Sequence, residues 1–135
     1  MSEENVKVVQ SIYDAFAKGD IPSVLGNLDQ QIEWREAENF IYADHNPYIG
    51  PQAVLEGVFM RLGMQWDHFT VTPDRILGAG DSVVVQGHYT GTYRKSGKKV
   101  RAQMVHVWDL RDGKATKFQQ YTDTLQFSDA IVHPE

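Results

Sequence analysis

The spacing of apolar residues changes once along this 135-residue chain, from a helical period to a strand period, at Phe69. Before that residue, apolar side chains recur every three to four positions, as on one face of a helix. After it they alternate with polar side chains, as on a strand with one buried face. Helices followed by an antiparallel run of strands are typical of an α+β fold, in which the helices must cover one face of the sheet.

Three helices are predicted in the first half of the chain. The first begins at Ser2, a suitable N-cap, and ends at Gly19. Asp20 can cap a short second helix. The third begins at Pro51, where a missing N–H costs nothing, and ends at Gly63.

Five strands are expected, a short one around Ile32 and Trp34 and four longer ones after Phe69. The four longer strands are residues 71–77, 83–93, 100–110 and 115–125, separated by turn sequences that contain glycine. A long twisted sheet wrapped around an amphipathic helix forms a cone, and the open end of a cone is a natural pocket. We treat residues 1–135 as a single domain, because no linker, repeat or low-complexity tract interrupts them.

The composition narrows the classes of partner. The formal charge of −5 disfavours nucleic acid, because phosphate binding needs a concentrated cationic surface. There is no cysteine, which excludes disulfides and thiolate chemistry. No apolar run approaches the roughly 20 residues of a membrane helix, and the N-terminus does not resemble a signal peptide. A cytoplasmic location, with no membrane partner, is therefore expected.

Several segments resemble a known family. They are Ile32-Glu33-Trp34, the run 46–51 that opens the third helix, and the closing run 111–124. Together with the order of elements they resemble the nuclear transport factor 2-like superfamily, in particular its SnoaL-like polyketide cyclase and ketosteroid-isomerase-related branch. The similarity spans residues 5–127. It implies a cone-shaped, cystatin-like roll of three N-terminal helices on a curved, mostly antiparallel sheet.

The side chains that face the pocket cannot be chosen from periodicity, because both faces of the strands are mixed. The resemblance selects one face, which would carry Gln86, His88, His106, Phe118 and Gln120. Met104, which has the same parity as His106, is a further predicted ligand-binding residue. The opposite faces, rich in valine and tyrosine, would then form a homodimer contact, as the family implies. A bulge would invert this assignment locally, and Asp123 is the residue where that matters most.

Glu36 is the first candidate for catalysis. The resemblance aligns it with the aspartate that moves a proton next to a carbonyl group in ketosteroid isomerases. A carboxylate beside Trp34 in an apolar mouth would be desolvated, which raises its pKa and suits a general acid or base. The alternative is a loop carboxylate that pairs with Arg35 or is solvated.

His88 and His106 are the other catalytic candidates, because a neutral imidazole can relay a proton or polarise a carbonyl group. Each could instead be a hydrogen-bonded core histidine. SnoaL-like cyclases pair the histidine that matches His106 with an aspartate, and here the matching residue is Gln120, which cannot exchange a proton. Gln86, His88 and Gln120 also replace the Asp-Arg-Asp set of limonene-epoxide hydrolases, so that chemistry is disfavoured.

The remaining candidates concern binding. Trp34, Phe59 and Phe118 would wall the pocket with aromatic surface, as a flat apolar ligand requires. Tyr13 and Tyr42 are the candidates for the phenol of an oxyanion hole. No histidine spacing supports a metal site, so neither a metal nor a cofactor is expected.

The sequence thus favours a small-molecule pocket protein that moves a proton on a compact apolar carbonyl compound, as an isomerase or cyclase would. Its predicted partners are a small apolar or aromatic molecule and a second copy of the chain. The alternative is a non-catalytic module for ligand binding or dimerisation.

Overall fold

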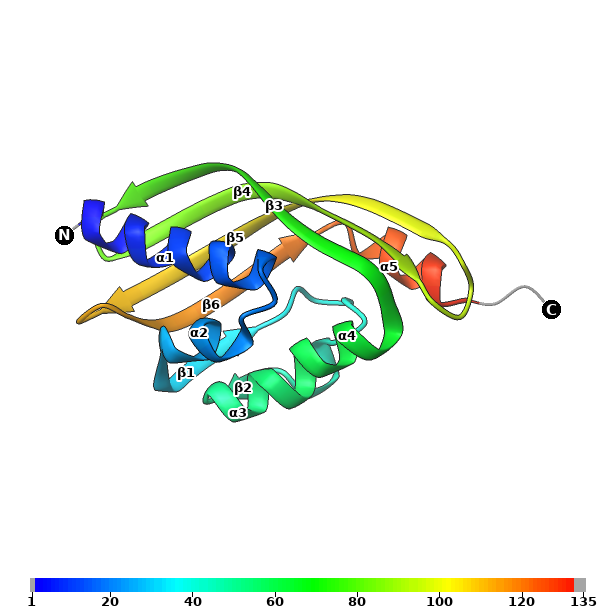
Figure 1. The fold of residues 1–135 in the computed structure, drawn as a ribbon, viewed down its shortest axis with the longest axis horizontal. Helices are drawn as coiled ribbons and strands as arrows, with labels where there is room; N and C mark the ends of the chain where they lie inside the picture. Colours follow the sequence, from blue (N-terminus) through cyan, green and yellow to red (C-terminus); the bar gives the residue numbers. More distant parts are fainter. Residues whose placement is uncertain (1, 133–135) are drawn as a thin grey trace.

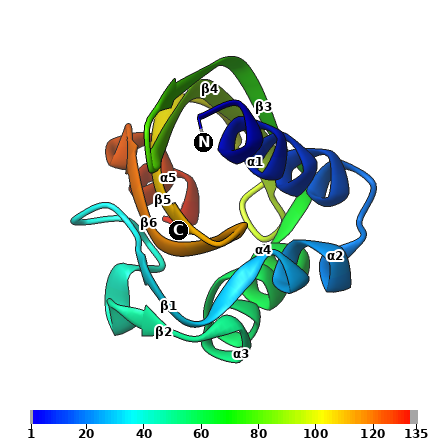
Figure 2. The same ribbon diagram turned by 90° about the vertical axis from the view of Figure 1, so that its left-hand side faces the viewer.

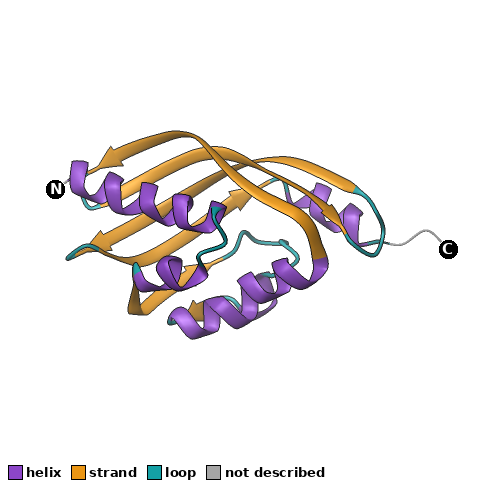
Figure 3. Ribbon diagram, in the orientation of Figure 1, coloured by secondary structure: helices purple, strands orange, loops and turns teal. Residues whose placement is uncertain are grey.

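The fold is an open, strongly curved sheet whose inner face is covered by helices (Figures 1 and 3). A computed structural model describes residues 2–132. The helices are α1 (Ser2–Ala17), α2 (Ile21–Gly26), α3 (Pro51–Val54), α4 (Met60–Gln65) and α5 (Thr124–Ile131), with a 3₁₀ turn at Ala43–His45. The strands are β1 (Leu28–Arg35), β2 (Tyr48–Ile49), β3 (Trp66–Ala79), β4 (Ser82–Tyr93), β5 (Lys99–Arg111) and β6 (Lys114–Thr122).

The six strands lie in the order β2-β1-β6-β5-β4-β3. The β1–β6 pair is parallel and the other four pairs are antiparallel. Seen nearly end-on, the sheet bends around an interior that α1, α2 and the α3–α4 segment close from the other side (Figure 2). The predicted α+β cone is confirmed.

The N-terminal helices begin and end where the sequence predicts. Gly19 ends α1 with a φ of 73°, a conformation that glycine adopts without strain. Asp20 then caps α2, because its carboxylate accepts a hydrogen bond from the backbone N–H of Ser23 at 3.2 Å. The apolar stripe of α1, with Val9 and Ile12 buried, packs toward the sheet.

The third helix and the C-terminus differ from the prediction. Residues Leu55–Phe59 form a π-helical turn that joins α3 to α4, and the helix continues past Gly63 to Gln65. The last strand ends at Thr122 instead of Leu125, and α5 follows it. This helix was missed because only Phe127 and Ala130 are buried in it, which is too few for a clear period. Among residues 2–132, no helix is both long and apolar enough to cross a membrane.

Candidate functional site

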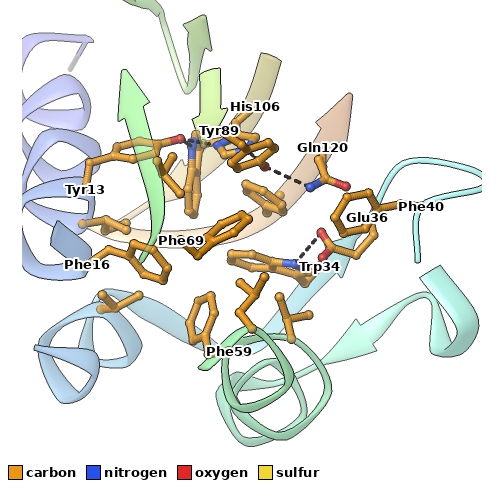
Figure 4. A pocket seen from close by; sticks show the side chains of 17 residues that line it. Tyr13, Phe16, Trp34, Glu36, Phe40, Phe59, Phe69, Tyr89, His106 and Gln120 are labelled. Carbon is orange, nitrogen blue, oxygen red and sulfur yellow. Dashed lines mark hydrogen bonds between the residues drawn. The ribbon is translucent and has the colours of Figure 1, made fainter. Parts of the chain in front are cut away.

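A mostly aromatic cavity lies between α1, the π-helical turn with α4, and the inner face of the sheet (Figure 4). Its free volume is about 60 Å³, and the space around it opens toward solvent. This is smaller than the roughly 300–1,000 Å³ of typical small-molecule pockets and restricts the cavity to a compact ligand. Its ionisable and amide side chains are Tyr13, Glu36, Tyr89, His106 and Gln120.

Glu36 follows directly after β1 and points into the cavity, where it is only 3% exposed. The indole N–H of Trp34 donates to Glu36 Oε2 at 3.2 Å. The predicted environment is therefore confirmed, and the pairing with Arg35 is wrong, because Arg35 binds Glu33 at 2.9 Å. Burial raises the pKa of Glu36 to about 8, although the Trp34 hydrogen bond and the charge of Arg61 each lower it.

The backbone of Glu36 is held by Asn46. The Glu36 N–H donates to Asn46 Oδ1 at 2.9 Å, and Asn46 Nδ2 donates to the Glu36 carbonyl oxygen at 2.8 Å. These two bonds tie the loop around Asn46 to the end of β1. They fix the direction in which the Glu36 side chain leaves the strand. This role could not be predicted from the sequence, because the partners are ten residues apart and meet only through the path of the loop.

His106 lies on β5, is 4% exposed, and contacts a phenol through each ring nitrogen. Its Nδ1 is hydrogen-bonded to the Tyr13 hydroxyl and its Nε2 to the Tyr89 hydroxyl. Trp108 Nε1 donates to the Tyr13 oxygen at 3.0 Å. Burial lowers the pKa of His106 to about 3, so the ring is neutral near pH 7.

Gln120 links this network to the Glu36 side of the cavity. Its Oε1 accepts a hydrogen bond from the Ala37 N–H at 3.1 Å, and its Nε2 donates to the Tyr89 hydroxyl at 2.9 Å. The orientation of the amide is thus set by a donor on one side and an acceptor on the other.

Aromatic rings form the rest of the wall. Trp34 stacks on Phe118 with ring centroids 3.7 Å apart, and Phe59 meets Trp34 edge-on at 5.6 Å. All three rings line the cavity, as predicted. The prediction that Met104 binds the ligand is wrong, because this buried side chain does not line the cavity. Its methyl carbon is instead 2.9 Å from the place that a β-carbon on Gly87 would occupy.

Two other predicted pocket residues lie on the opposite face of the sheet. In an antiparallel pair, directly opposite residues share a face. His106 is opposite Val85, so the inward residues of β4 are Val83, Val85 and Tyr89. The prediction that Gln86 and His88 face the cavity is wrong.

Those two residues point to the outer face of the sheet, where His88 Nδ1 lies 3.0 Å from Asp74 Oδ2. The register between β4 and β5, which the sequence does not give, decides the matter. Tyr89 was missed for the same reason, whereas Tyr13 was named but not placed.

Asp123 lines a hollow on the outer face and stands at the N-terminus of α5. It accepts a hydrogen bond from Gln126 Nε2 at 2.9 Å. No bulge turns it toward the cavity. Within residues 2–132, no three histidine, aspartate or glutamate side chains are grouped so that they could hold a metal ion.

Comparison with known proteins gives a consistent picture. The profile of the SnoaL-like domain family matches residues 9–118. No curated protein matches the chain. A crystal structure of an NTF2-like protein from Burkholderia thailandensis E264 is 34% identical, with a TM-score of 0.90 over 95% of this chain and 97% of that one.

Two further solved structures are similar. TerC, co-crystallised with polyporic acid, is 26% identical, with a TM-score of 0.83 over 95% of this chain and 98% of that one. A candidate SnoaL-like polyketide cyclase from Jannaschia sp. CCS1 shares the fold at 20% identity, with a TM-score of 0.84 over 99% of this chain and 95% of that one.

Proposed function

This chain belongs to the SnoaL-like domain family, and we propose that it binds a compact apolar carbonyl compound in its cavity and moves a proton on it. The reaction would be an isomerisation or cyclisation of the general acid–base type. It would need only the groups of this chain and no cofactor.

The observation that carries the proposal is the state of Glu36. A general base works best when its pKa lies near the working pH, since it must be deprotonated and still bind the proton strongly. Burial beside Trp34 raises the pKa of Glu36 to about 8. The ionised fraction of Glu36 can therefore take a proton from a carbon next to a carbonyl group, and the resulting acid can return it to another carbon.

The other polar groups would orient the ligand. Gln120 is fixed by hydrogen bonds at both ends of its amide, and His106 is a neutral ring held between two phenols. Neither exchanges protons readily near pH 7, which leaves Glu36 as the group that does. This replaces the proton-relay role predicted for His106, and His88 has no part in it because it lies outside the cavity.

The walls define the class of ligand. Trp34, Phe59 and Phe118 present flat apolar surfaces, and the cavity is too small for an extended chain of rings. A neighbour of the same fold, TerC, was crystallised with the small molecule polyporic acid. A small cyclic ketone is therefore a suitable first probe.

The test is the exchange of hydrogen for deuterium at the carbons next to the carbonyl group of cyclohexanone in D₂O, followed by NMR. Glu36→Gln should slow the catalysed exchange by about 10²–10⁴-fold, the usual contribution of a positioned base. Glu38→Gln, which changes an exposed carboxylate two residues away, is the matched control and should leave the rate unchanged. An unchanged rate in Glu36→Gln, with the fold intact, contradicts the assignment.

A second candidate is a binding protein without catalysis. It is favoured by Gln120, which stands where the cyclases of this family carry a carboxylate. In that case cyclohexanone stabilises the protein, by about 2.7 kcal/mol at a hundredfold excess over its dissociation constant, without any exchange. Detection of exchange that depends on Glu36 removes this candidate.

A homodimer through the outer face of the sheet belongs to the same proposal, because the family resemblance implies it. The outward row Gln86, Val105 and Tyr121 crosses the middle of that face, and Tyr121 is 55% exposed. The expected valine- and tyrosine-rich surface is wrong for β4, which presents Gln86 and His88 instead. The contact would therefore be more polar than the sequence indicates.

A further inference from the structure

The polar network around His106 holds one hydrogen-bond donor more than it can use. It consists of the His106 ring, the phenols of Tyr13 and Tyr89, and the two fixed donors Trp108 and Gln120 (Figure 4). A phenol oxygen has one proton to donate and can accept two hydrogen bonds. The protons of this network can therefore be counted.

Two of these groups, Trp108 Nε1 and Gln120 Nε2, can act only as hydrogen-bond donors. The indole nitrogen of Trp108 carries a proton and can only donate, so it takes one acceptor position of Tyr13. The Gln120 amide presents its nitrogen to Tyr89, because its oxygen already accepts from the Ala37 N–H. Each phenol oxygen therefore has one acceptor position and its own proton left for the ring between them.

The ring is neutral. It is 4% exposed, and the side chains hydrogen-bonded to it or packed on it are uncharged: Tyr13, Tyr89, Trp108 and Phe118. A neutral imidazole has one N–H and one nitrogen lone pair. It therefore accepts a hydrogen bond from one phenol and donates a hydrogen bond to the other.

The phenol that accepts from the ring now has both acceptor positions filled, and its own proton has no partner among residues 2–132. If the proton of the ring is on Nε2, the unpaired hydroxyl is that of Tyr89. If it is on Nδ1, the unpaired hydroxyl is that of Tyr13. Both phenols line the cavity.

We propose that His106 is a positioning residue whose tautomer decides which phenol, Tyr13 or Tyr89, offers its free O–H to the oxygen of a bound carbonyl compound. The choice of this ligand class rests on the proposed function. The count of protons does not, because it follows from the network alone.

The two tautomers would place the donor at different ends of the cavity. Tyr13 reaches the ring from α1, whereas Tyr89 is bonded to Gln120 and lies close enough to Glu36 for that charge to affect it. A carbonyl oxygen on Tyr89 puts the neighbouring carbon on the side of Glu36. One cavity could thus hold the same ligand in a reactive and an unreactive pose, without moving a side chain.

The experiment compares the affinities of cyclohexanone and methylenecyclohexane, which have nearly the same shape but differ in the acceptor oxygen. The ratio of their dissociation constants is measured for the wild type, Tyr13→Phe, Tyr89→Phe and the double variant. Either single variant should keep the preference for the ketone, because the ring can switch its proton and free the remaining phenol. The double variant should lose it, by roughly twofold to tenfold, the effect of one neutral hydrogen bond.

Two results would overturn the inference. If one single variant alone gives the full loss, that phenol is a dedicated donor and the tautomer selects nothing. If the double variant keeps the preference, neither phenol binds the ketone oxygen. The preference is measured by binding alone, whereas the proposed function is tested by the proton exchange that Glu36→Gln should slow, so the two can fail independently.

A measurement on the unmodified protein covers the case in which a variant does not fold. ¹⁵N NMR of the His106 ring at pH 7 should show one protonated and one unprotonated nitrogen, and saturating cyclohexanone should change the ratio of the two tautomers. A doubly protonated ring, or a ratio that stays constant when the ketone binds, contradicts the proposal.

Discussion

Two residues of opposite acid–base type are both held uncharged in the same cavity. Burial favours the protonated form of Glu36 and the deprotonated form of His106, because in each case that form carries no charge. The cavity can thus remain dry and apolar while it contains an acid and an imidazole. Their uncharged states make opposite contributions to the pH dependence of folding.

For Glu36 the sign follows from its raised pKa. The folded protein binds this proton up to about pH 8, whereas the unfolded chain releases it near pH 4.5. The contribution to stability is therefore complete below pH 4.5 and is lost as the pH rises toward 8. Glu36→Gln should remove this loss. The unfolding free energy of the variant minus that of the wild type should therefore increase by roughly 1.4 kcal/mol for each pH unit between 4.5 and 8.

Urea unfolding at a series of pH values checks this prediction. Glu38→Gln, at an exposed position, should give a profile parallel to that of the wild type. A parallel profile for Glu36→Gln would mean that the carboxylate is ionised in the folded protein at neutral pH.

His106 contributes to the pH dependence of stability in the acidic range. Its pKa falls from 6.5 in the unfolded chain to about 3 in the folded protein, so the stability it contributes is present above pH 6.5 and is lost as the pH falls toward 3. These two residues together favour the folded state most between about pH 4.5 and 6.5.

At the scale of single residues, the sequence predicted some side chains well. Glu36 could be placed because Trp34 lies two positions away and the resemblance marked the site. Gln86 and His88 were misplaced because a strand with mixed faces has no preferred inner side until its register with the next strand is known. Asn46 could not be predicted, since its two hydrogen bonds depend on how a loop returns to the end of β1.

Among the elements, the helical segment 51–65 departs most from regular geometry, and its π-helical turn packs against an aromatic ring. Gly57 lies in that turn, and a β-carbon there would stand 2.1 Å from Cε1 of Tyr48. The Tyr48 hydroxyl donates to the Tyr42 carbonyl oxygen at 2.7 Å, which holds the ring in place. Only glycine therefore fits beneath it.

Gly57→Ala should thus destabilise the protein, although alanine favours a helix over glycine by about 1 kcal/mol. Overpacking typically costs about 1–3 kcal/mol and outweighs that gain. Gly63→Ala in α4 is the matched control, because nothing lies within 4 Å of its new methyl group, and it should stabilise by up to about 1 kcal/mol. Thermal unfolding of both variants decides the matter, and a stabilising Gly57→Ala would show that the Tyr48 ring is free to move.

The sequence predicted most helices and strands because their periods are long and clear. It missed α5 and the two-residue strand β2, which have few buried positions. The π-helical turn was not predicted, because the apolar spacing of residues 54–62 is that of an ordinary helix.

For the whole molecule, the order of the strands explains why the cone was predicted but its outer surface was not. Turn sequences join β3 to β6 in a meander, so their neighbours follow from the chain order. The face that each strand turns outward depends on register, and the composition of a dimer contact depends on that face.

The proposed dimer is tested at its centre. Val105→Arg places a charge in the middle of the outward row between Gln86 and Tyr121, where a monomer would expose it to water but a dimer would bury it. Sedimentation should show twice the mass of one chain for the wild type and a single mass for this variant. Met64→Arg on α4, at a side chain that is 68% exposed, is the control and should remain dimeric. A wild-type chain that sediments as a monomer contradicts the proposal.

The parallel pairing of β1 with β6 also bears on how the protein is made. It joins Trp34 to Phe118, partners 84 positions apart, and thereby completes the wall beside Glu36. Contacts between such distant segments form late, because the loss of chain entropy precedes any gain from packing. During synthesis β1 can therefore pair only with the two-residue strand β2, and its other edge stays open until β6 has left the ribosome.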